Sequence, residues 1–171
     1  SRAAEWARLL MLMPNIVPSL VYAVGLYRYY AELHLLGSYL GVILAHAVMG
    51  LPYVIIAVSA SLANFDRRVE QAAKSLGASG WQTIRLVIVP NILPGLLSGA
   101  IFAFVHSWDE LVVVLFIASR AIHTIPRLMW DGINENLDPK IAVVAAAMIL
   151  FTVTLLLAAQ PLRRARAAAS T

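Results

Sequence analysis

The sequence predicts an all-α integral membrane protein, because its composition is strongly apolar and its uncharged runs are long. Of its 171 residues, 61% are hydrophobic and 13% are charged, and the mean hydropathy is +0.79. A soluble domain is nearer half apolar and a quarter charged. A helix needs about 20 mostly apolar residues to cross a bilayer, and several runs reach that length. The absence of cysteine excludes disulfides and thiolate chemistry.

Four membrane-spanning helices are predicted within one transmembrane domain that covers residues 1–171. The first run contains Pro14 and Pro18, which remove helix hydrogen bonds. The third is interrupted by Asp109 and Glu110 and then continues as an apolar stretch. The predicted spans are residues 9–27, 39–61, 92–117 and 140–160.

The distribution of Lys and Arg predicts the orientation of these spans. Nine of the 13 basic residues precede the first span, lie in 62–90 or follow the last span. The other four are Arg28, Arg120, Arg127 and Lys140. Because basic residues favour the cytoplasmic side, both ends and the loop 62–90 are expected there.

Small residues recur four apart at two places, Gly37 with Gly41 and Gly95 with Gly99. This spacing lets two helices approach closely in lipid. Glycine without a packing role is common in membrane helices and explains either pair equally well.

The loop 62–90 is predicted to be a helix–turn–helix outside the bilayer. Asp66 is placed to cap its first helix, and Gly77 follows that helix at the position where a left-handed residue ends it. Ser79 and Gln82 have the spacing of a capping box, so a second helix is expected to begin there. That helix runs on towards Pro90.

This loop resembles the cytoplasmic coupling loop of binding-protein-dependent ABC importer permeases. The shared pattern is Ala72-Ala73, three residues, Gly77 and an apolar run closed by Pro90. The pattern in the family begins with Glu-Ala-Ala, whereas this chain has Gln71 at the leading position and Glu70 just before it. An ion pair from position 71 is therefore not expected unless Glu70 replaces it. An ordinary amphipathic interfacial loop is the alternative interpretation of the segment.

The resemblance extends over nearly the whole chain and is to the spermidine/putrescine group of permeases. It implies a helical bundle like that of type I ABC importer permeases. Complete members have about six spans, so the four predicted here are expected to correspond to the third through sixth, with the N-terminal two missing. The matching motifs are Met13-Pro14, Ile16-Val17-Pro18, Leu51-Pro52-Tyr53-Val54, Ser107-Trp108-Asp109-Glu110, Thr124-Ile125-Pro126, Met129-Trp130 and Asp138-Pro139.

The resemblance also implies a function and a set of partners. Such a permease lies in the bacterial inner membrane and pairs with a second permease, identical or different. It works with cytoplasmic ATPase subunits, which would bind the loop 62–90, and with an extracytoplasmic solute-binding protein. The implied solute is a polyamine or a similar small cation. The sequence has no phosphate-binding loop, so ATP is expected on the ATPase subunits and no cofactor on this chain.

His106, Asp109 and Glu110 are the candidate residues of the translocation pathway. A carboxylate at mid-bilayer costs about 2.5–3.5 kcal/mol on insertion scales, and such residues usually face a bundle interior or a water-filled path. His106 precedes the two carboxylates by three and four positions, so it shares their helix face. The alternative is that the carboxylates lie at the outer interface.

A membrane enzyme and a secondary transporter are the two alternative classes of function. A membrane enzyme would need a nucleophile with a base or a metal motif, and Ser107 beside His106 is only a neighbouring pair. The remaining histidines, His34, His46 and His123, lack metal-ligand spacing.

A proton-coupled secondary transporter could use His106, Asp109 and Glu110, but it would not need the loop 62–90. The basic residues are not gathered into a patch of the kind that binds nucleic acid, so no nucleic-acid partner is expected.

Overall fold

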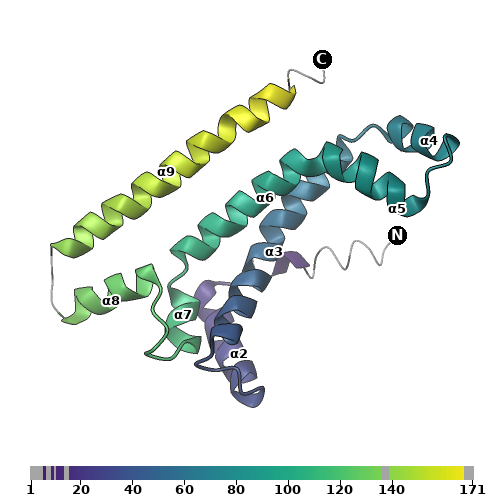
Figure 1. The fold of residues 1–171 in the computed structure, drawn as a ribbon. Coiled ribbons are helices and arrows are strands. Elements are labelled where there is room, and N and C mark those ends of the chain that lie inside the picture. Colours follow the sequence, from purple (N-terminus) through teal and green to yellow (C-terminus); the bar gives the residue numbers. More distant parts are fainter. Residues whose placement is uncertain (1–5, 7–8, 10, 14–15, 136–138, 168–171) are drawn as a thin grey trace.

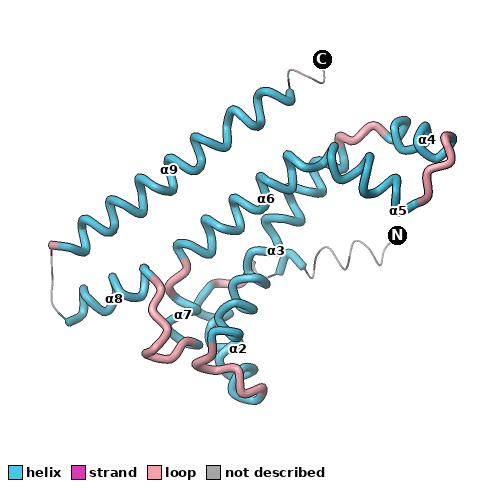
Figure 2. The backbone as a smooth tube through the Cα atoms, in the orientation of Figure 1, coloured by secondary structure: helices cyan, strands magenta, loops and turns pink. Residues whose placement is uncertain are grey.

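The computed structural model describes residues 6, 9, 11–13, 16–135 and 139–167, which form helices joined by short turns (Figure 1). No strand occurs within these ranges (Figure 2), which confirms the predicted all-α membrane fold. The elements are α2 (Ser19–Glu32), α3 (Tyr39–Ala63), α4 (Arg67–Ser75), α5 (Gly80–Thr83), the π-helical turn η2 (Ile84–Ile88), α6 (Val89–Asp109), α7 (Val112–Ile117), α8 (Ile125–Glu135) and α9 (Lys140–Ala167).

Three described helices are long and apolar enough to cross a membrane. They are Tyr39–Ala63, Gly80–Asp109 and Lys140–Ala159, and they overlap the second, third and fourth predicted spans. The prediction of four spans is therefore matched by three candidates in the described part of the chain.

The segment predicted as the first span, 9–27, is arranged differently, and part of it lies outside the described residues. Its described helix, α2, begins after Pro18 and continues to Glu32. Pro18 precedes the helix because its ring and missing N–H do not fit a helix interior. The 14 residues of α2 extend only about 21 Å at 1.5 Å per residue, less than the roughly 30 Å hydrocarbon layer.

The predicted third span, 92–117, is two helices in the structure. Helix α6 ends at Asp109, and Glu110 adopts an extended conformation with φ −74° and ψ 117°. The carboxylate of Glu110 accepts a hydrogen bond from the backbone N–H of Val113 at 2.9 Å, at the start of α7. A carboxylate that satisfies the first N–H groups of a helix favours a helix start at that point. The two carboxylates mark this position in the sequence, but the apolar stretch on either side led to the prediction of one continuous span.

The closest helix packing is between α3 and α6, which run side by side (Figure 1). A Cβ atom at Gly99 would lie 2.8 Å from Cα of Val54, and one at Gly95 would lie 2.9 Å from the carbonyl oxygen of Ala57. The pair Gly95 and Gly99 therefore allows backbone approach, as one of the two interpretations of its spacing predicted. By contrast, Gly37 has φ +70° and forms a turn.

A second contact region lies where α7 packs against α2. Ala23 and Tyr30 of α2 are buried there, as are Val113, Val114 and Ile117 of α7. Because α7 turns back at Glu110, it covers one side of α2 rather than extending α6. Helix α9 stands apart from this region in Figure 1 and contacts α6 and α8.

The glycine at position 99 provides a test of the α3–α6 contact. Gly99→Leu is expected to lower the thermal unfolding midpoint of the full-length protein in detergent. Added methylenes in a tightly packed contact typically cost about 1–3 kcal/mol. Gly25→Leu is the matched control, because no atom lies within 4 Å of a Cβ placed there. Equal midpoints for the two variants would contradict the assigned packing role.

Candidate functional site

The first candidate site is the loop 62–90, whose first helix, α4, has the predicted ends. Asp66 accepts a hydrogen bond from the backbone N–H of Arg68 at 2.8 Å. At the other end Gly77 has φ +86°, and its N–H donates to the carbonyl of Lys74 at 3.0 Å. The N–H of Ala78 donates to the carbonyl of Ala73 at 3.1 Å. These two bonds define a Schellman turn, which glycine forms without steric cost.

The second helix of the loop begins with the predicted capping box. The N–H of Ser79 donates to Oε1 of Gln82 at 2.8 Å, and the N–H of Gln82 donates to Oγ of Ser79 at 3.3 Å. Thr83 is only 1% exposed, and its hydroxyl donates to the carbonyl of Ser79 at 3.0 Å. The helix then continues through η2 and Pro90 into α6, so Pro90 does not end it.

The surface of this loop has an uncharged side chain, Gln71, at the leading position of the motif, together with exposed apolar side chains. Glu70 accepts a hydrogen bond from Nζ of Lys74 at 2.6 Å; this bond, together with the positive charge, holds the pKa of Glu70 below its usual value. Glu70 is therefore engaged within α4, while Gln71 is exposed beside it. Leu76 and Trp81, on either side of the turn, are 89% and 70% exposed.

The second candidate site is the polar contact between α3 and α6. Nδ1 of His46 and Oγ of Ser107 share a hydrogen bond of 2.7 Å. The hydroxyl of Tyr53 lies 3.4 Å from Nδ1 of His106, and the two rings are 5.0 Å apart. Sequence reasoning selected His106 but missed its α3 partner, since no local pattern shows which residues of two helices meet.

The two predicted carboxylates have different surroundings. Asp109 is exposed at the end of α6 and lines cavities of about 340 and 230 Å³ on the side that faces α9. Trp130 of α8 lines the larger cavity with it, and Trp108 lines the smaller. Glu110 is 8% exposed and caps α7, as described above. The structure therefore places His106, Asp109 and Glu110 close in the chain but against different neighbours.

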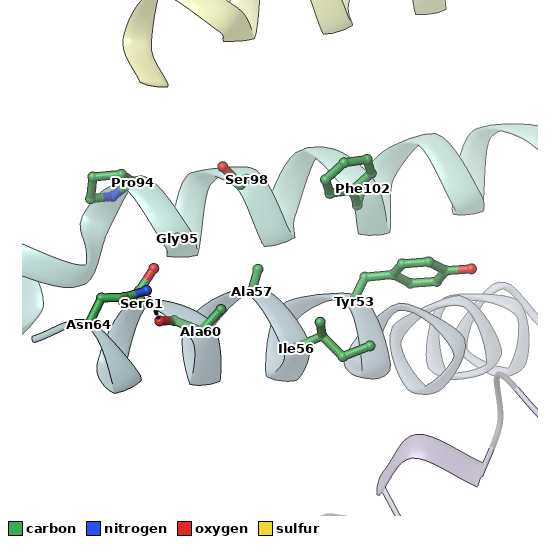
Figure 3. Close-up of a pocket in the computed structure, with 10 residues that line it drawn as sticks. All are labelled: Tyr53, Ile56, Ala57, Ala60, Ser61, Asn64, Pro94, Gly95, Ser98 and Phe102. Carbon is green, nitrogen blue, oxygen red and sulfur yellow. Dashed lines mark hydrogen bonds between the residues drawn. The ribbon is translucent and has the colours of Figure 1, made fainter. Parts of the chain in front are cut away.

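A groove of about 590 Å³ runs along the α3–α6 contact, near the loop 62–90 (Figure 3). Several of its lining residues are small. Its lining is mostly apolar, with hydroxyl and amide groups from both helices. The lining residues are Tyr53, Ile56, Ala57, Ala60, Ser61, Asn64, Pro94, Gly95, Ser98 and Phe102.

Arg127 of α8 fixes the segment that joins α7 to α8. Its Nη1 donates to the carbonyl of Ser119 at 2.7 Å and to those of Ala118 and Ile122 at 3.3 Å. The side chain is buried, and its Nε lies 3.9 Å from a carboxylate oxygen of Asp131. Sequence reasoning counted Arg127 only as a charge on the outer side. The structure gives this cation a specific role at the C-terminal end of α7, where a helix dipole favours it.

The apolar helices and the capped loop between two of them are the features of a membrane subunit of an importer that depends on a binding protein. Residues 1–165 match the family described as binding-protein-dependent transport system inner membrane component. The chain belongs to this family.

Among its relatives are permeases of polyamine transport systems. The chain is 30% identical over 147 residues to the spermidine/putrescine transport system permease protein PotC of Haemophilus influenzae, covering 86% of this chain and 57% of PotC. It is 27% identical over 154 residues to the putrescine transport system permease protein PotI of Escherichia coli, covering 86% and 55%. The chain thus spans about half the length of the relatives it matches.

A relative with a different solute is also similar. The molybdenum transport system permease protein ModB of Haemophilus influenzae is 35% identical over 121 residues, covering 69% of this chain and 52% of ModB. The percentage of identical residues is thus similar for permeases of different solutes, and the solute must be inferred from other features.

The buried Arg127 leads to a prediction about the segment that joins α7 to α8. Arg127→Met is expected to lower the thermal midpoint and to speed proteolysis within 118–124. The reason is that each buried polar group left without a partner costs about 1–3 kcal/mol. Arg120→Met, at an exposed position, is the control and should behave as wild type. Equal cleavage rates in both variants would show that Arg127 does not hold this segment.

Proposed function

We propose that the chain is a membrane-spanning permease subunit of an ATP-driven ABC importer in the bacterial inner membrane. It moves a small solute, a polyamine or similar cationic compound, which an extracytoplasmic binding protein delivers. The observation that carries this proposal is the geometry of the loop 62–90. A rigid helical turn projects from the cytoplasmic end of two helices and exposes the family motif. PotC and PotI support the polyamine class.

The loop is the docking site for the ATPase subunits in this proposal. Gln71 and Ala72 are exposed on α4, and Ala72 is small enough to let a partner approach closely. Leu76 and Trp81 offer exposed apolar anchors near the turn. Since Glu70 is hydrogen-bonded to Lys74, the contact at the leading motif position is made by the neutral amide of Gln71.

The remaining assignments concern the membrane and the solute. The charge distribution supports a cytoplasmic location for the loop and for both ends of the chain. A second permease, identical or different, completes the pathway. Asp109 is the carboxylate that meets the cationic solute, because it is exposed and lines cavities with aromatic side chains. Glu110 supports this site by capping α7.

Co-purification tests the docking assignment. The full-length permease should retain its ATPase partner as wild type and lose it as Gly77→Asp, because aspartate is strained at φ +86° and adds a charge to the turn. Gly77→Asn is the matched control: asparagine tolerates the left-handed conformation better and is neutral, so binding should persist. If no variant, wild type included, binds an ATPase, the importer assignment fails. A proton-coupled carrier built on His106, Asp109 and Glu110 would then be the function to test.

Removing the charge is expected to have different effects at Asp109 and at Glu110. Asp109→Asn is expected to reduce uptake of a labelled diamine while leaving the thermal midpoint unchanged. Glu110→Gln is expected to lower the midpoint, because a neutral amide is a weaker cap than a carboxylate. Uptake into proteoliposomes and thermal unfolding measure the two effects. A normal uptake rate for Asp109→Asn would remove Asp109 from the pathway.

A further inference from the structure

The helix that links the docking loop to the membrane contains one irregular turn. Residues Gly80–Asp109 form a continuous helical segment, but Ile84–Ile88 have π-helical bonding. The N–H of Val89 donates to the carbonyl of Ile84, five residues earlier. Turns of this kind are rare, and they occur mostly as single interruptions at functional positions.

Local chemistry accounts for the position of this π-turn. In a regular α-helix, Pro90 would lack a donor for the carbonyl of Leu86 and its ring would crowd that carbonyl. A wider turn before the proline relieves this contact. The side chain of Asn91 then donates to the carbonyl of Val87 at 2.7 Å, so a side chain supports the altered turn.

Outside its own helix, the π-turn contacts α4. None of its five residues is buried, and Ile84 and Leu86 are 45% and 69% exposed. Changing between π and α bonding there would therefore move side chains against α4 without breaking a buried contact. Backbone bonding, Pro90 and Asn91 are the main local determinants of its geometry.

The elements on the two sides of the π-turn are held in different ways. On the cytoplasmic side α4 packs against α5, both helices are capped, and Thr83 is buried directly before the turn. On the membrane side α6 is held to α3 through the close contacts at Gly95 and Gly99. In Figure 1, α4 and α5 lie beyond the ends of α3 and α6, and they are joined to them by the loop after α3 and by the π-turn.

We propose that the π-turn at Ile84–Ile88 is the mechanical joint of this permease. Movement of α4 and α5 reaches α6 through a change in the bonding of this turn, which tilts one part of the helix against the other. The proposal gives Pro90 a physical role: it keeps the turn from settling into a regular α-helix. It rests on the proposed function only in taking the ATPase as the source of movement.

Distance measurements between spin labels test the joint, and the chain has no cysteine to interfere. Labels at Gly80→Cys and Leu97→Cys lie on either side of the π-turn, about 26 Å apart for a straight helix at 1.5 Å per residue. Labels at Val143→Cys and Leu157→Cys on α9, about 21 Å apart by the same rise, are the control within a regular helix. Electron–electron double resonance on the full-length protein in nanodiscs should give a broader distribution across the π-turn than on α9.

Two proline variants test whether Pro90 causes the broad distance distribution across the π-turn. Pro90→Ala restores a backbone donor and removes the ring, so the distribution across the turn should narrow to that of α9. Pro94→Ala is the matched control, since Pro94 lies between the same labels but outside the π-turn, and it should leave the distribution unchanged. A wild-type distribution as narrow as that of α9, with no effect of Pro90→Ala, would overturn the proposal.

The functional role is measured on the assembled transporter. With ATPase bound, nucleotide should shift the mean distance across the π-turn in wild type but not in Pro90→Ala. Solute uptake, expressed per bound ATPase, should be lost in that variant. Uptake at the wild-type rate would refute a role in coupling. If no ATPase binds to wild type, the proposed function fails instead, while the nanodisc comparison still decides whether the joint exists.

Discussion

The close approach of α3 and α6 is the constraint on which the other features depend. Gly95 and Gly99 allow the two backbones to meet, and in lipid such packing replaces the hydrophobic effect as the source of helix association. The contact sets the distance at which His46 reaches Ser107 and Tyr53 reaches His106. It also aligns the two helix ends from which α4 and α5 project.

Local features of the sequence were sufficient to predict the helix–turn–helix of the loop 62–90. The caps at Asp66 and Ser79 and the left-handed Gly77 involve residues within five positions of one another, so their geometry follows from short-range chemistry. For the same reason the all-α class followed from composition and run length. Membership of the transport family, matched over residues 1–165, agrees with that analysis.

Features that depend on contacts between distant segments were not predictable in this way. Asp109 and Glu110 interrupt the apolar run 92–117 where the helix breaks, but the two charges alone do not show that one of them caps a new helix. The second loop helix was expected to run on until Pro90 and Pro94 disturb its hydrogen bonding; that it continues through one wider turn was not predictable from the sequence. Arg127 is another case, since its carbonyl partners lie in an irregular segment whose path depends on the tertiary fold.

The break at Glu110 also has an electrostatic consequence. A helix carries roughly half a negative charge at its C-terminus and half a positive charge at its N-terminus. Here the C-terminus of α6 and the N-terminus of α7 meet within three residues. The carboxylate of Glu110 compensates the positive end of α7, whereas Asp109 adds its charge to the negative end of α6. By these values the α6 side of the break carries roughly one and a half negative charges, whereas the α7 side carries only about half a negative charge.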